Sequence, residues 1–363
     1  MKKERESNFE LLRVLAMFMV ITVHYIGHGG ALKHTNIFSI NFYYSNIIES
    51  FARFSVPLYT CIGSYFMVSK EANFKKLIKL WGQVVFYSVG LYFFLFLMGY
   101  IEFNLFQSIK SILPIIMNQY GFVTAYFILM ILSPFLNKFI LSLDRLELKK
   151  LVIILFVLFI VFGAGFPVGV ITNSYIALLI IIYLFISYIK LYVSVKKIHK
   201  KYILLYLFSV FGIFSLRMLL YKIGLGYSSD VFVSYNSTLI IIGTFSLFMF
   251  FRTIKIQSKF INKVASLTFG VYLIHDNNYV RDILYTNILN TQQWFNSDKF
   301  LFITIVSIVS IYVICSFIEY CRIKIFNLLN INKHIEITVE YIFNKYISKI
   351  KNIENKMKSI NDN

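Results

Sequence analysis

Two ionisable residues in the first apolar run, Arg13 and His24, have types and spacing that could serve chemistry. On a helix their separation is about 16 Å, just over three turns, so both lie on one face, and Glu10 shares that stripe. A histidine can act as general base on a hydroxyl, because its unperturbed pKa of about 6.5 is close to neutral pH. Arginine keeps its charge and suits a phosphate or a developing oxyanion. The structural alternative is that Arg13 reaches the cytoplasmic surface and His24 pairs with a neighbouring helix.

Other polar residues also interrupt apolar runs, where an ionisable side chain costs about 2.5–3.5 kcal/mol on insertion scales and usually faces a cavity or a partner. Glu49 and Arg53 are four residues apart and can neutralise each other. Pro57 follows them and can kink the helix. On their own, these three residues are more typical of helix architecture than of a catalytic site.

A later run, 264–284, starts apolar and turns polar at His275 and Asp276, so its second half is predicted to line an aqueous mouth. We expect these neighbours to project from different sides of a regular helix and therefore not to form a ready-made catalytic pair. Asn236, between Tyr235 and Ser237, lies in a polar segment at the start of another apolar run. Helix capping is its alternative role.

The helices that must position these groups are those of a membrane protein. Of the 363 residues, 58% are hydrophobic and 15% are charged, against about 25% charged in a soluble domain. The net charge of +19 is spread between the apolar runs, which argues against nucleic-acid binding. The sequence predicts no metal site, because Cys61, Cys315 and Cys321 have no metal-like spacing.

At about 20 residues per crossing, the chain is predicted to be an all-α integral membrane bundle of about ten transmembrane helices. Most of its 36 lysines and arginines fall in alternate connections, which by the positive-inside rule places both termini in the cytoplasm. The abundance of Asn, Ile and Lys suggests an AT-rich bacterial genome and thus a bacterial plasma membrane. The predicted spans are 9–28, 46–68, 80–100, 121–141, 151–168, 174–192, 202–220, 234–251, 264–284 and 299–319.

Two domains are expected: a transmembrane domain over residues 1–329 and a basic cytoplasmic tail over 330–363. Apolar residues of the tail recur at loosely helical spacing. The tail could therefore lie on the anionic inner leaflet as an amphipathic helix, or it could be solvated.

These features resemble the membrane-bound acyltransferase type 3 family, especially bacterial polysaccharide O-acetyltransferases, over nearly the whole chain. The matches occur in the family's order. They are Arg13 and His24 in the first helix, Val56-Pro57-Leu58 through Tyr65-Phe66, Thr124-Ala125-Tyr126 through Ser133-Pro134-Phe135-Leu136-Asn137, Ser234-Tyr235-Asn236-Ser237, and Phe269-Gly270-Val271-Tyr272-Leu273-Ile274-His275-Asp276. The chain departs from the family at Gly63-Ser64-Tyr65, at Tyr120-Gly121-Phe122 and at Lys190, where relatives often carry arginine.

The resemblance implies transfer of an acyl group, such as acetyl, from a cytoplasmic acyl-CoA to a hydroxyl of a cell-envelope polysaccharide. Acyl-CoA would be a donor substrate, with no permanently bound cofactor, and polysaccharide-assembly proteins are expected partners. His24 is then the leading catalytic residue, with Arg13 as its partner or as a donor contact. The residues expected to contact substrate or donor are Arg53, Tyr126, Asn236, His275 and Asp276.

The alternative function is a non-enzymatic carrier of surface polysaccharide, in which Arg13, Arg53 and Arg217 would line a path for an anionic glycan. Dependence on acyl-CoA separates the two, because a carrier needs no thioester. A glycan polymerase is disfavoured by the absence of long, charged outer loops. The chain has no Walker loop, which leaves ATP-driven transport by this chain alone unsupported.

Overall fold

The computed structural model describes residues 6–71, 74–161, 174–194, 200–339, 341 and 345. All regular structure within these residues is helical. Seven segments are long and apolar enough to cross a membrane: Ser7–His34, Phe74–Leu97, Gly121–Ser142, Tyr175–Tyr192, Lys200–Lys222, Gly226–Thr253 and Phe300–Leu328.

The elements in chain order are α1 (Ser7–His28), α2 (Ala31–His34), α3 (Ile40–Ala52), α4 (Ser55–Met67), α5 (Phe74–Leu97), α6 (Leu105–Ile112), α7 (Gly121–Ser142), α8 (Arg145–Leu155), the π-helix η1 (Phe156–Val161), α10 (Tyr175–Tyr192), α11 (Lys200–Lys222), the 3₁₀-helix η3 (Gly226–Val233), α12 (Thr238–Thr253), α13 (Lys259–Ala265), α14 (Thr268–His275), α15 (Asn278–Asp282), the π-helix η4 (Ile283–Ile288), the 3₁₀-helix η5 (Thr291–Trp294) and α16 (Phe300–Leu328).

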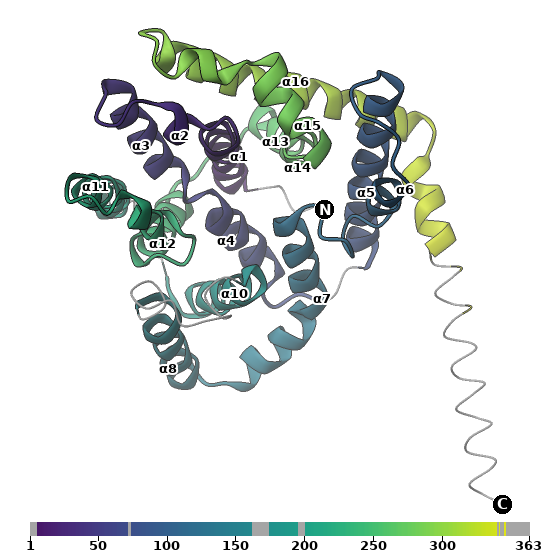
Figure 1. The fold of residues 1–363 in the computed structure, drawn as a ribbon. Helices are drawn as coiled ribbons and strands as arrows, with labels where there is room; N and C mark the ends of the chain where they lie inside the picture. The colour runs from purple at the N-terminus through teal and green to yellow at the C-terminus, as the bar shows by residue number, and fades with distance from the viewer. Residues whose placement is uncertain are drawn as a thin grey trace, which may run out of the picture.

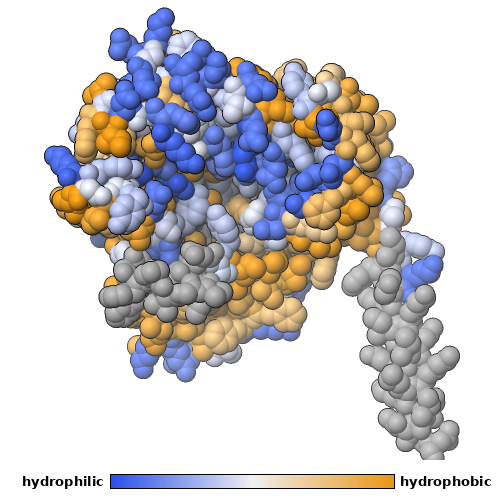
Figure 2. Space-filling view, viewed as in Figure 1, coloured by the Kyte–Doolittle hydropathy of each residue, from blue (hydrophilic) through white to orange (hydrophobic). Residues whose placement is uncertain are grey.

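Helix α1 is the most enclosed of the long helices (Figure 1). It packs against α3, α4, α12, α13, α14 and α16. Of its most apolar stretch, 61% is buried, against at most 50% in the other six candidate spans. Figure 2 shows hydrophilic residues gathered over the middle of the visible face and hydrophobic ones along much of its rim. The polar stripe of α1 is therefore shielded from lipid by its neighbours.

The predicted span 46–68 is wrong as a single helix, because the chain breaks between α3 and α4. Arg53 is the C-cap of α3 and Phe54 the N-cap of α4. Pro57 explains the position of the break: it has no N–H, and its ring excludes the carbonyl four residues earlier, which belongs to Arg53. Pro57 then lies in the first turn of α4, where proline is tolerated.

The predicted span 264–284 is also interrupted, into α13, α14, α15 and η4. The break between α14 and α15 falls at Asn277, whose backbone is extended and whose side chain caps α15 by accepting the N–H of Tyr279. The amide of Asn277 also donates to the hydroxyl of Tyr120, at 2.8 Å. Asparagine favours such caps over a helix interior. As a result α14 ends at His275, beside α1.

Two further predictions fall partly outside the described residues. In the span 151–168, α8 passes into η1 at Phe156, and residues 162–168 lie outside the described residues. In the tail, residues 331–339 are helical. The ammonium of Lys79 lies 2.9 Å from the carboxylate of Glu336, and this hydrogen bond lowers the pKa of Glu336. Apart from residues 341 and 345, the remaining tail lies outside the described residues.

Glu49 lies at the centre of a buried ion cluster that ties α3 to α11. Its pairing with Arg53 is confirmed, at 2.6 Å. The fully buried Arg217 of α11 donates to the other carboxylate oxygen of Glu49, also at 2.6 Å. Asp230, an exposed residue, lies 3.7 Å from Arg217. Two guanidinium groups therefore share one buried carboxylate.

Candidate active site

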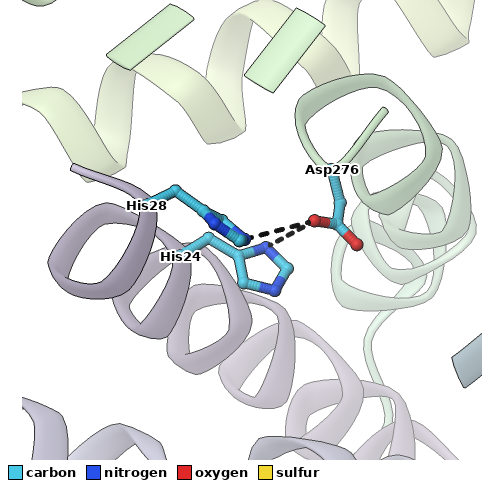
Figure 3. Close-up of side chains that lie close together, drawn as sticks. All are labelled: His24, His28 and Asp276. Carbon is cyan, nitrogen blue, oxygen red and sulfur yellow. Dashed lines mark ion pairs between the residues drawn. The ribbon is translucent and has the colours of Figure 1, made fainter. Parts of the chain in front are cut away.

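His24 lies in the last turns of α1, where the polar end of α14 meets it. Its Nδ1 atom is 3.1 Å from Nε2 of His275 and 3.4 Å from a carboxylate oxygen of Asp276. His28, one turn further along α1, has its Nε2 atom 3.8 Å from the same oxygen (Figure 3). Residues 251 positions apart in the chain thus form one cluster of polar side chains.

The hydrogen bonds of this cluster determine which nitrogen of His24 can act as a base. Nδ1 of His275 lies 2.6 Å from the carbonyl oxygen of Val271, which can only accept, so this Nδ1 carries the proton. Nε2 of neutral His275 then offers a lone pair, and Nδ1 of His24 donates to it. The carboxylate of Asp276 lies 3.4 Å from the same nitrogen, close enough to stabilise positive charge on the ring. The lone pair of His24 is therefore on Nε2, the nitrogen that could take a proton from a substrate.

Asp276 is itself held in place by Arg281 of α15. The guanidinium of Arg281 donates to the carboxylate at 2.8 Å and to the backbone carbonyl of Asp276 at 3.2 Å. A fixed carboxylate beside Nδ1 stabilises the imidazolium that forms when the histidine accepts a proton. The arrangement of His24, His275 and Asp276 is thus suited to general-base catalysis.

His24, His28 and Asp276 could also hold a metal ion, because their ligand atoms all lie within 4.8 Å of one another. Two features oppose this use. Nδ1 of His24 would have to lose the proton that it donates to His275. The guanidinium of Arg281 also places a positive charge 2.8 Å from the carboxylate oxygen. The contacts therefore favour a hydrogen-bonded relay over a metal centre.

This cluster opens on a cavity of about 220 Å³ around the C-terminal half of α1. Tyrosine rings and short polar side chains form much of its wall. Hydroxyl-rich ligands such as sugars can stack on tyrosine rings and exchange hydrogen bonds with their hydroxyls. Besides His24, His28, Asp276 and Arg281, the polar lining residues are Ser55, Tyr175, Tyr235 and Tyr272.

A second cavity, of about 700 Å³, lies at the other end of α1 and is rich in cations. Arg13 lines it and pairs with Glu10. Three lysines from other segments, Lys70, Lys76 and Lys190, line it as well. Four cationic side chains, with only Glu6 and Glu10 to oppose them, suit a ligand that carries several phosphates.

The structure brings only three of the predicted site residues together: His24, His275 and Asp276. His275 and Asp276 were expected to project from different sides of a regular helix. Both instead lie within 3.4 Å of Nδ1 of His24, because α14 ends at His275 and Asp276 does not continue its helical geometry. Arg13 is in the other cavity, and its backbone carbonyl accepts a hydrogen bond from Tyr59 at 3.0 Å.

The remaining predicted residues line neither cavity. Arg53 pairs with Glu49, and its guanidinium lies 5.8 Å from the ring centre of Tyr235, which does line the cavity beside His24. Tyr126 stacks on Phe122, and its hydroxyl occupies the space that a side chain at position 63 would fill, so that glycine there permits the contact. Asn236 accepts a hydrogen bond from Ser234 in the turn before α12.

Sequence reasoning missed His28, Arg281 and the lysines of the second cavity as site residues. His28 follows His24 by four positions, a spacing that places both on one helix face.

Lys190 departs from the family pattern but has a clear local role. Its ammonium donates to the carbonyls of Tyr65 and Val68, at 2.7 and 2.8 Å, and so holds the C-terminal end of α4 beside the cavity.

A helical bundle of this hydrophobicity, with a histidine relay at one end of its central helix and a cationic cavity at the other, defines a multi-pass membrane protein suited to group transfer. Residues 6–318 match the sequence model of an acyltransferase domain, that of the acyltransferase 3 family. The chain belongs to this family, and acyl transfer is the activity that membership implies. Neither a curated protein nor a solved structure matches the chain.

The relay predicts different effects for two substitutions of His275. We expect His275→Ala to lower the turnover rate by about 10- to 100-fold. This is less than the roughly 10⁴-fold effect of losing a sole orienting acceptor, because the carboxylate of Asp276, 3.4 Å from Nδ1 of His24, can take the place of Nε2 as acceptor. In His275→Gln the side-chain oxygen can replace Nε2, so turnover should stay within about threefold of the wild type. Both are measured as acyl transfer at a saturating concentration of the acyl donor. Equal losses in the two variants would contradict a relay and indicate a packing role.

Proposed function

We propose that this protein is a membrane-embedded O-acyltransferase that moves an acyl group, acetyl in the simplest case, from acyl-CoA to a hydroxyl of a cell-envelope polysaccharide or its precursor. The observation that carries the proposal is the histidine relay between α1 and the end of α14, with Nε2 of His24 left as its free base. Membership of the acyltransferase 3 family supports the reaction class.

The two cavities support a division of the site between the two substrates. The cationic cavity would hold the phosphates of acyl-CoA, and the tyrosine-lined cavity would hold the sugar. Arg13 is about 16 Å from His24 along the helix axis. At this distance its guanidinium can contact a phosphate of the donor but not the thioester oxygen that reacts beside His24. The donor's extended arm would then run along α1 toward His24.

The reaction needs one proton carrier and no redox step. Nε2 of His24 takes the proton of the sugar hydroxyl as its oxygen attacks the thioester carbonyl carbon. The carbon–sulfur bond breaks, the ester forms, and the departing thiolate takes the proton from the imidazolium of His24. The carboxylate of Asp276 stabilises this imidazolium while it exists.

For the topology we propose ten membrane passes with both termini in the cytoplasm of a bacterial cell. The seven candidate spans support this arrangement, if the interrupted segments α3–α4 and α13–α15 and the segment that begins with α8 also cross. The cationic cavity then faces the cytoplasm, where acyl-CoA is made, and the other cavity faces the envelope.

Isotope-labelled acetyl-CoA tests the proposed function directly. Membrane vesicles that contain the protein, supplied with labelled acetyl-CoA and envelope polysaccharide, should yield labelled polysaccharide, and vesicles without it should not. The ester should be released by mild base. If polysaccharide crosses the membrane with no thioester present and gains no label, the carrier function holds instead, and His24 and Asp276 have no catalytic role.

Arg13 provides a prediction that concerns the donor alone. We expect Arg13→Gln to raise the acetyl-CoA concentration at half-maximal rate by about tenfold or more, because a charged partner of phosphate is lost. The maximal rate should change much less. Lys150→Gln, which changes an exposed cytoplasmic lysine outside the cavity, is the control and should leave both quantities unchanged. An unchanged half-saturation value in Arg13→Gln would remove Arg13 from the donor site.

A further inference from the structure

A third cavity lies on the lipid-facing side of the bundle and shares no lining residue with the cavity beside His24. It has a volume of about 360 Å³ and lies between the first turn of α5, the second half of α7 and the end of α4. Phe74, Ile131 and Phe135 line it and are 62%, 47% and 67% exposed. In a membrane-spanning bundle such side chains contact lipid, so this groove is open to the bilayer.

The polar residues of the groove give it a net positive charge. Lys70, Lys76 and Lys138 line it, and Glu71 is the only acidic residue among the lining residues. All four residues lie in connections between helices or at the helix ends beside these connections. The positive-inside rule assigns these segments to the cytoplasm. Basic pockets between helices at this depth are typical sites for the headgroups of anionic lipids.

Hydrogen bonds fix the wall of the groove where α7 meets the end of α4. The amide of Asn137 donates to the carbonyls of Met67 and Lys70, at 3.1 and 2.8 Å. Pro134 has no N–H for the carbonyl of Met130, and the hydroxyl of Ser133 donates to that carbonyl instead, at 2.9 Å. The groove is therefore built into the fold, as is usual for binding sites of about 300–1,000 Å³.

We propose that this groove binds one anionic phospholipid of the inner leaflet. The lysines pair with its phosphate, and one acyl chain lies along Ile131 and Phe135. Phe66, Lys70 and Lys76 line both this groove and the cationic cavity, so the bound lipid would close the bilayer side of that cavity. The proposal concerns lipid binding and does not depend on acyltransferase activity.

Lys138 offers a clean test because it lines the groove and not the cationic cavity. The full chain in detergent is titrated with phosphatidylglycerol, and bound lipid is counted by native mass spectrometry. One phosphatidylglycerol should bind more tightly than phosphatidylcholine. Lys138→Gln should weaken its binding about fivefold, the effect of one lysine near an anionic headgroup. Lys149→Gln, which changes an exposed lysine of α8, is the matched control and should have no effect.

Three results would overturn the proposal. An equal effect of Lys138→Gln and Lys149→Gln, or equal binding of the two lipids, would indicate diffuse attraction to a cationic surface. Displacement of phosphatidylglycerol by an equal concentration of glycerol phosphate would identify a site for free phosphate rather than for a lipid.

Discussion

His24→Ala is expected to lower the rate of acyl transfer by about 10²- to 10⁴-fold, the usual contribution of a general base. Alanine has no group that can take the hydroxyl proton. His275 does not line the cavity, and the carboxylate of Asp276, which does, is held by the guanidinium of Arg281. The rate is measured as transfer of label from acetyl-CoA to polysaccharide in membrane vesicles that contain equal amounts of protein. The acetyl-CoA concentration at half-maximal rate should be unchanged, because the cationic cavity is intact.

His34→Ala is the matched control for this variant. His34 lies in α2, just beyond the same end of α1, and stacks on Phe295 at 6.4 Å between ring centres. Its substitution removes a nearby imidazole without touching the relay, so the rate should stay close to that of the wild type. Wild-type activity in His24→Ala, or an equal loss in His34→Ala, would show that His24 is not the base.

Glu49→Ala is expected to destabilise the folded protein by about 3–5 kcal/mol, the usual result of removing one member of a buried ion pair. The substitution leaves Arg53 and Arg217 without their shared carboxylate, and Arg217 has no exposed surface. The melting temperature of the detergent-solubilised protein measures the effect. We expect a marked decrease, and reduced abundance in the membrane.

Asp230→Asn tests whether the burial of Glu49 is the cause of the destabilisation expected in Glu49→Ala. Asp230 faces the same arginine at 3.7 Å, but its side chain is 83% exposed. Exposed ion pairs contribute little to stability, so the melting temperature should hardly change. If Glu49→Ala is as stable as Asp230→Asn, the cluster does not hold α3 against α11.

The long apolar helices could be predicted from sequence, because length and hydropathy alone define them. The predicted spans 9–28 and 174–192 agree with α1 and α10 to within a few residues. The breaks were harder to predict. A proline explains the end of α3 once it is seen, but the break at Asn277 depends on a partner, Tyr120, that lies 157 positions away.

Some residues of the candidate site could be predicted from the sequence, but their arrangement in space could not. Arg13 and His24 stand out because ionisable groups are rare in apolar runs. The family resemblance leaves Arg13 either as the partner of His24 or as a donor contact, and in the structure the two residues line cavities at opposite ends of α1. Nor can composition distinguish lysines that set topology from those that line a cavity, and Lys70 and Lys76 do both. The contact between His24 and His275 depends on how α14 packs on α1.

Mass spectrometry of surface polysaccharide from three strains tests the central claim most directly. The strains carry the intact protein, no protein, or His24→Ala at equal abundance. The proposed function predicts an added mass of an acyl group, such as acetyl, in the intact strain alone, with similar amounts of polysaccharide in all three. A deletion strain that makes less polysaccharide with an unchanged pattern of substitution would contradict acyl transfer and support the carrier function.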